Sequence, residues 1–284
     1  MLSLHNWGGT GFRGTADGTI LADRYNVVAI GVDYLGSGPL EEQGGYPYDF
    51  GWLQALDALR ALYAVFSGLR RRGIRFADDR LYATGGSGGG NVALMANKLA
   101  PQTFAAVIDL CGMKKLSDEI AFEPGGNLQA GYSRDPASPF HLTRDEQEIR
   151  FLGHPGHLDT MRALGCQARI ISVHGVDDDV CPFADAREFA WNMKQSGLDF
   201  SFIEVTNDLV DGAVFQSTGH DLGNRSEIVD QVGRELLVNE PSGARRSGPS
   251  NFERGTDVQF RTEGGKWVVD FQQGLPIGRF ESEE

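Results

Sequence analysis

The sequence predicts an α/β fold with a doubly wound, mostly parallel sheet, and three observations lead to this prediction. Apolar runs of strand length recur, helical patterns separate them, and a glycine-rich turn joins one run to the helix that follows. The runs are near-continuous rather than alternating, which is typical of strands covered on both faces. They occupy residues 2–4, 27–32, 81–84, 106–110, 170–173 and 200–205. Alternation of strands with helices is the pattern of the α/β class.

Four helices are predicted between and after these runs. In residues 48–72, Trp52, Leu56 and Leu59 recur at spacings of four and three, and Gly73 offers a C-cap. Asn224, with Glu227 three residues on, resembles a capping box that opens the last helix. The other three helices are expected at residues 91–99, 184–196 and 224–237.

Two regions interrupt the alternation. Residues 113–165 are rich in Pro, Gly and charge, and we expect a partly helical cap there because long structureless loops are rare. Residues 240–284 open as a linker and continue as a β-hairpin pattern, so the main α/β unit is expected to span residues 1–239. Residues 26–34 are predicted to form a long apolar strand, and such a strand needs protection wherever it is left unpaired. We expect the hairpin to cover an exposed part of its own sheet or to pair with a neighbouring chain, and a tail that only rests on the surface is the alternative.

The composition excludes some partners. Lys and Arg total 26 against 39 Asp and Glu, a net charge of −13, which disfavours nucleic acid and membrane surfaces as partners. The start of the chain lacks the features of a secretory signal, so a cytoplasmic location is expected. Three scattered cysteines, Cys111, Cys166 and Cys181, are predicted to be core residues. The spacing of His154 and His157 is weak evidence for a metal, so neither metal nor cofactor is predicted.

The glycine-rich turn, Gly85-Gly86-Ser87-Gly88-Gly89, matches G-x-S-x-G between a predicted strand and a predicted helix. Glycine is needed two residues before and two after the serine because the turn leaves no room for a Cβ. A dinucleotide-binding loop would need a third glycine where Asn91 stands, and a Walker A loop would need Lys followed by Ser or Thr. A purely structural glycine turn stays open as an alternative. The pattern therefore favours Ser87 as a nucleophile.

With the segment HGVDDDVCP at residues 174–182, the sequence resembles the α/β-hydrolase superfamily, in particular its prolyl-oligopeptidase-like and dienelactone-hydrolase-like branches. In this fold the chain order is serine, acid, histidine. The resemblance places the acid at Asp178, with Asp177 as the alternative. It places the base at His220, which follows the strand at 200–205 and precedes the last helix.

The resemblance also implies an oxyanion hole and a substrate pocket. One donor is the N–H of Gly88, and the second comes from Asn6 or Trp7 in the loop HNWGG, a variant of the HGGG loop of esterases. The opening strand corresponds to the third strand of the family sheet, so its first two strands are expected to be missing. The residues expected to line the substrate pocket are His5, Trp7, Tyr34 and Met113.

These observations predict a serine hydrolase that cleaves small-molecule carboxylic esters through an acyl-enzyme. A serine peptidase of the prolyl-oligopeptidase type is the first alternative, less favoured because such enzymes usually carry a propeller that this length cannot contain. A non-catalytic hydrolase-fold binding protein is the second, disfavoured because all three triad members are present. A homo-oligomer is a further expectation.

Overall fold

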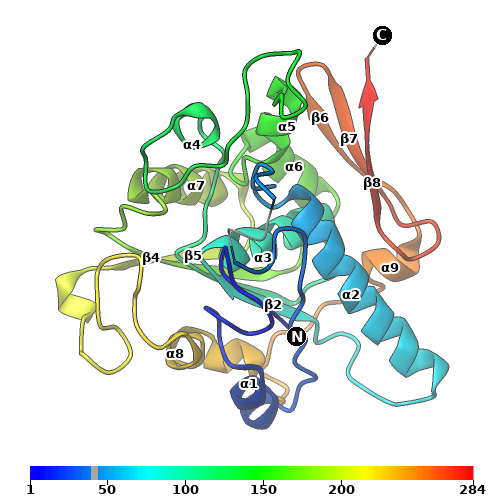
Figure 1. Ribbon diagram of the computed structural model, residues 1–284. Coiled ribbons are helices and arrows are strands. Elements are labelled where there is room, and N and C mark those ends of the chain that lie inside the picture. The colour runs from blue at the N-terminus through cyan, green and yellow to red at the C-terminus, as the bar shows by residue number, and fades with distance from the viewer. Residues whose placement is uncertain (40–43, 284) are drawn as a thin grey trace.

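The computed structural model describes residues 1–39 and 44–283, and its centre is a five-stranded parallel sheet (Figure 1). The strand order is β1-β2-β3-β4-β5, so each strand pairs with the next one along the chain. The strands are β1 (Leu2–Leu4), β2 (Tyr82–Gly86), β3 (Ala106–Leu110), β4 (Arg169–Gly175) and β5 (Phe200–Val205). The predicted α/β class with a parallel sheet is confirmed.

Helices cover both faces of the sheet, as the term doubly wound requires. α1 (Gly18–Tyr25) and α8 (Arg225–Leu237) lie together on one face, below the sheet in Figure 1, and share a core cluster with the strands. The opposite face carries a larger cluster. It is formed with α2 (Trp52–Arg71), α3 (Gly88–Leu99), α6 (Pro155–Ala163) and α7 (Phe183–Ser196).

Two elements near the N-terminus differ from the prediction. The run at residues 27–32 forms no strand and contributes one isolated bridge, in which Ile30 pairs with Leu2. Ile30 donates to Met1 O at 2.8 Å and accepts from Ser3 N at 3.0 Å. The carbonyl of Val28 accepts from the terminal ammonium of Met1 at 2.8 Å. The prediction missed α1. This helix begins because the Asp17 carboxylate accepts hydrogen bonds from the next turn.

The segment between β3 and β4 is partly helical, as predicted for residues 113–165. α4 (Asp118–Phe122) and α5 (Arg144–Ile149) belong to the insert, together with α6. Leu116, Ile120 and Leu142 form a small core of the insert with Phe50. Helix α6 packs instead on α3 and α7 of the main layer. Among the described residues, none of the helices combines the length and the apolarity that crossing a bilayer requires.

The C-terminal segment contains α9 (Asn251–Arg254) and a separate antiparallel sheet of β6 (Val258–Thr262), β7 (Gly265–Asp270) and β8 (Ile277–Ser282). The predicted hairpin corresponds to β6 and β7, and β8 was missed because its residues are mostly exposed and carry no apolar alternation. The sheet packs on α2, α5 and α6 rather than on the central sheet. The expectation that it covers an exposed part of its own sheet is therefore wrong. Its aromatic face, with Trp267 4.6 Å from Trp52 between ring centroids, packs on helices instead. A short 3₁₀ helix spans Asn207–Leu209.

Candidate active site

Ser87 lies at the turn between β2 and α3, where the backbone has φ 55° and ψ −121°. A positive φ is uncommon for a residue with a side chain, and surrounding structure must hold it in place. A Cβ on Gly85 would lie 2.2 Å from the carbonyl oxygen of Gly89, and one on Gly89 would lie 2.0 Å from that of Leu4. The turn therefore requires glycine at both positions. It presents Ser87 at the N-terminus of a 12-residue helix, at the carboxyl end of its strand.

Asp178 and His220 meet at the same edge of the sheet, in the loops that follow β4 and β5. Nδ1 of His220 lies 2.9 Å from Oδ2 and 3.1 Å from Oδ1 of Asp178. The neighbouring Asp177 accepts a hydrogen bond from Thr218 Oγ1 at 2.6 Å instead. The structure thus brings Asp178, and not Asp177, together with His220.

Hydrogen bonds keep Asp178 ionised in spite of its burial. Burial by itself would raise the pKa of this carboxyl group, but hydrogen bonds from His174 and His220 outweigh burial and hold the pKa well below its ordinary value. The backbone N–H groups of Val180 and Cys181 also donate to Oδ1, at 3.0 and 2.8 Å. A fixed carboxylate at Nδ1 orients the imidazole and leaves Nε2 available to a reacting group.

Ser87 and His220 are not joined by a hydrogen bond in the part of the chain that the structure describes; the Ser87 hydroxyl interacts instead with the thiol of Cys181. Such hydrogen bonds often tighten only when substrate binds. His220 remains accessible, since 19% of its side-chain surface is exposed. Cys111 and Cys181 are buried, and Cys166 is mostly buried. This agrees with the prediction that the three cysteines are core residues.

Two backbone amides meet beside the nucleophile. A Cβ on Gly88 would lie 2.9 Å from the backbone nitrogen of Trp7. The N–H groups of Gly88 and Trp7 donate to no acceptor within the described ranges, whereas that of Asn6 donates to Arg13 O at 3.4 Å. Two free donors at one point form the kind of arrangement that binds an oxyanion.

Tyr48 lies at the site although its sequence context did not predict it there. Its ring stacks on that of Trp7 at 3.9 Å between centroids, and its hydroxyl would be 2.6 Å from a Cβ on Gly88. The hydroxyl is buried and makes no hydrogen bond of ordinary geometry among the described residues, although the side chain of Gln54 lies near it. No local pattern marks this tyrosine, because the loop that carries it reaches the site only through tertiary packing.

The structure buries three of the four residues expected to line the substrate pocket. His5 stacks on Tyr34 at 4.1 Å between ring centroids, and the Tyr34 hydroxyl donates to the carbonyl of His5. Met113 is buried in the small core of the insert. His5, Tyr34 and Met113 therefore make their contacts inside the protein. Of the four residues, only Trp7 keeps exposed surface.

The sequence model of the prolyl oligopeptidase family matches residues 58–236, which is more than half of the chain. The chain belongs to this family. The resemblance noted in the sequence is confirmed, and the chain has the α/β-hydrolase fold. No curated protein matches the chain.

Solved structures of low identity share the fold of this member of the prolyl oligopeptidase family. A puromycin-hydrolysing peptidase of Mycobacterium tuberculosis has 18% identity and a TM-score of 0.54, over 86% of this chain and 35% of that one. An acylaminoacyl peptidase of Pyrococcus horikoshii has 15% identity and a TM-score of 0.54, over 85% and 38%. A truncated carbohydrate esterase from gut microbiota has 14% identity and a TM-score of 0.54, over 81% and 83%. The chain thus spans little more than a third of the two peptidases.

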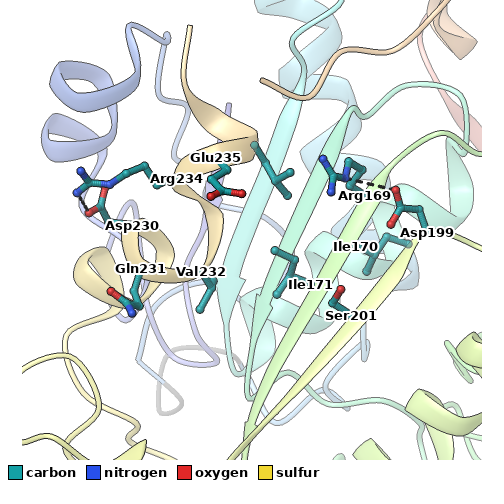
Figure 2. A pocket seen from close by; sticks show the side chains of 11 residues that line it. Arg169, Ile170, Ile171, Asp199, Ser201, Asp230, Gln231, Val232, Arg234 and Glu235 are labelled. Carbon is teal, nitrogen blue, oxygen red and sulfur yellow. Dashed lines mark hydrogen bonds and ion pairs between the residues drawn. The ribbon is translucent and has the colours of Figure 1, made fainter. Parts of the chain in front are cut away.

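Two cavities of this family member differ in their position relative to Ser87. A cavity of about 510 Å³ is lined by Tyr48 and by the rings of Tyr46, Tyr132 and Phe140, so it adjoins the residue that stacks on Trp7. Figure 2 shows another hollow, of about 420 Å³, between α8 and the strands β4 and β5. Arg169 and Asp199 line it at the amino ends of the two strands. It lies away from the carboxyl ends, where Ser87 is found.

Proposed function

We propose that the protein hydrolyses carboxylic esters of small molecules through an acyl-enzyme on Ser87. Oγ of Ser87 attacks the ester carbonyl carbon while Nε2 of His220 takes the hydroxyl proton. Asp178 holds the imidazole and stabilises its charged form. The proton then passes from His220 to the departing alcohol as the ester bond breaks. Water, deprotonated by His220, attacks the acyl group and releases the carboxylic acid and free Ser87.

The hydrogen bond between Asp178 and His220, at the edge of the sheet where Ser87 stands, carries this proposal. The three residues follow β2, β4 and β5, and the carboxyl ends of parallel strands lie at one edge. The strained turn at Ser87 supports the same role, because such strain persists where surrounding structure imposes it and is concentrated at functional sites.

The oxyanion formed on the ester carbonyl is assigned to the N–H groups of Gly88 and Trp7. Asn6 is the less suitable donor because its N–H already donates to Arg13 O. We add the hydroxyl of Tyr48 as a third donor, since it is buried beside Gly88 and makes no hydrogen bond of ordinary geometry in the described chain. Each donor of this kind is worth about 3 kcal/mol in the transition state.

Ester cleavage is the first candidate, because a carbohydrate esterase is among the solved structures that share the fold over most of this chain. A peptidase is the second candidate, and the match to the prolyl oligopeptidase family supports it. The cavity beside Tyr48 offers an aromatic surface for either the acyl or the leaving group.

The two candidates are separated by comparing kcat/KM on nitrophenyl esters of increasing acyl length with kcat/KM on aminoacyl nitroanilides. The proposal expects turnover of esters with little or no cleavage of anilides, and loss of turnover in His220→Ala. Anilide cleavage that matches ester cleavage would establish the peptidase instead. If neither class is hydrolysed, the protein is a binding protein with the hydrolase fold.

A further inference from the structure

Three side chains with metal-ligating atoms meet away from Ser87, where the insert contacts the C-terminal sheet. Glu148 is on α5, His154 caps the N-terminus of α6, and His157 lies in the first turn of α6. Oε1 of Glu148 is 3.3 Å from Nε2 of His154 and 3.9 Å from Nε2 of His157. One ligand atom from each residue lies within 4.8 Å of the other two.

His157 is arranged as a metal ligand would be. Its Nε2 lies 2.8 Å from the carbonyl oxygen of Arg261 in β6, and since a carbonyl only accepts, this nitrogen carries the proton. The lone pair that can bind a metal is then on Nδ1, the other ring nitrogen from the one that lies 3.9 Å from Glu148. Nδ1 is buried with no hydrogen-bond partner in the described chain. The side chain is 1% exposed. A histidine that donates one N–H to a carbonyl and keeps the other nitrogen free matches the outer-shell pattern of metal sites.

His154 and Glu148 give the cluster access to solvent, with 30% and 24% of their side chains exposed. His154 Nδ1 accepts a hydrogen bond from the backbone N–H of His157 across 3.4 Å, which is a long contact. If His154 coordinates a metal through Nε2, its ring proton must be on Nδ1. The long contact with the backbone N–H of His157 is then lost.

The buried ammonium of Lys98 is the group that opposes a cation here. It donates to the carbonyls of Ile149 and Phe151 at 2.7 and 3.0 Å. Among the described residues no ion pair joins Lys98 to Glu148, whose carboxylate lies within 4 Å of the two histidines instead.

We propose that Glu148, His154 and His157 bind a divalent transition-metal ion, with Zn²⁺ as the best fit, and that the ion fastens the insert to the C-terminal sheet. Two imidazoles and one carboxylate are a common zinc ligand set, with water as the fourth ligand. Ligand atoms around tetrahedral zinc lie about 3.3 Å apart, close to the separation of Glu148 and His154. The fastening follows from the bond of His157 to Arg261 in β6. The proposal is independent of the ester hydrolysis at Ser87.

Binding is tested by titrating the metal-free full chain with ZnCl₂ in a calorimeter. We expect one site, with affinity at least about tenfold weaker in Glu148→Gln and in His154→Ala. His141→Ala serves as the matched histidine control. Cys181→Ser controls for one of the two other groups of ligand-type side chains, formed by Asp178, Cys181 and His220, and neither variant should change binding. Ca²⁺, which prefers oxygen ligands, should not bind.

No zinc binding by the wild type would overturn the proposal, and so would binding that survives both Glu148→Gln and His154→Ala or is lost in Cys181→Ser. Limited proteolysis tests the fastening. Zn²⁺ should slow release of a C-terminal fragment from the wild type and leave the rate unchanged in His154→Ala. Equal rates with and without Zn²⁺ in the wild type would contradict the fastening.

Discussion

Nε2 of His174 lies 3.2 Å from Oδ2 of Asp178, on the carboxylate that also receives the hydrogen bond of His220. His174 is fully buried and also donates to the carbonyl of Cys181 at 2.8 Å. Asp178 is thus held between two imidazoles, and both favour its charged form. The proposed catalysis depends on that carboxylate remaining charged while its side chain is out of contact with water.

Asp178→Asn is expected to lower kcat for ester hydrolysis by about 10⁴-fold, because the amide no longer favours the required tautomer of His220. Asp177→Asn is the matched control, since Asp177 bonds to Thr218 and not to His220. It should keep kcat within about threefold of the wild type. Steady-state kinetics of the two variants provide the measurement, and equal losses in both would remove Asp178 from the proposed triad.

Tyr48→Phe is expected to lower kcat by about 100-fold with little change in KM, because the hydroxyl is proposed to bind the oxyanion and not the ground-state ester. Tyr63→Phe is the control, since Tyr63 is on α2 and its hydroxyl donates to the carbonyl of Gln273 in the C-terminal segment. If Tyr48→Phe retains wild-type kcat, the hydroxyl is not a donor, and Gly88 and Trp7 alone account for the oxyanion hole.

Gly89→Ala is expected to destabilise the fold by at least about 2 kcal/mol, because its Cβ would lie 2.0 Å from the carbonyl oxygen of Leu4. Gly68→Ala is the control. Nothing lies within 4 Å of a Cβ there, and alanine in the interior of α2 should stabilise the chain by up to about 1 kcal/mol. Urea unfolding measures both, and a tolerated Gly89→Ala would contradict the tight turn.

The sequence was most informative where chemistry and local backbone coincide. The turn at Ser87 was predictable because few structures besides a nucleophile turn need glycines on both sides of a serine between a strand and a helix. The pairing of Asp178 with His220 also follows from motif and chain order. Tyr48 was not predictable, because its place beside Gly88 depends on a stack with Trp7 that no spacing encodes.

The errors in the predicted fold concern contacts between distant segments. An apolar run such as residues 27–32 predicts a strand, but only one isolated bridge, between Ile30 and Leu2, joins the described run to the sheet. The tail was expected at the central sheet because its hairpin pattern shows which side chains are apolar and not which surface receives them. The face of α2 around Trp52 receives Trp267 instead. The burial of His5 and Tyr34 likewise results from their mutual stacking.

Glu253→Gln is expected to lower the free energy of unfolding by about 1 kcal/mol at pH 7, allowing for solvent screening of this partly exposed group. Burial raises the pKa of Glu253, but hydrogen bonds from Ser250 and Arg70 outweigh burial and lower the pKa to about 2. A depressed carboxyl pKa contributes stability that is complete above about pH 4.5, the ordinary value, and is lost as the pH falls towards 2.

The difference between wild type and Glu253→Gln should therefore be present at pH 7 and disappear near pH 2, as measured by urea unfolding across this range. Glu283→Gln is the control, because Glu283 pairs with Arg261 on the surface and both side chains are mostly exposed. A difference between wild type and Glu253→Gln that is independent of pH would show that the carboxylate charge is not the cause.

Labelling by a fluorophosphonate probe tests the role of Ser87 most directly, because the probe reacts only with a serine that a base has activated. The account predicts that the wild type is labelled at Ser87, and that Ser87→Ala is not labelled while its melting temperature stays near that of the wild type. A wild type that is not labelled, or a label that persists in folded Ser87→Ala, would contradict it.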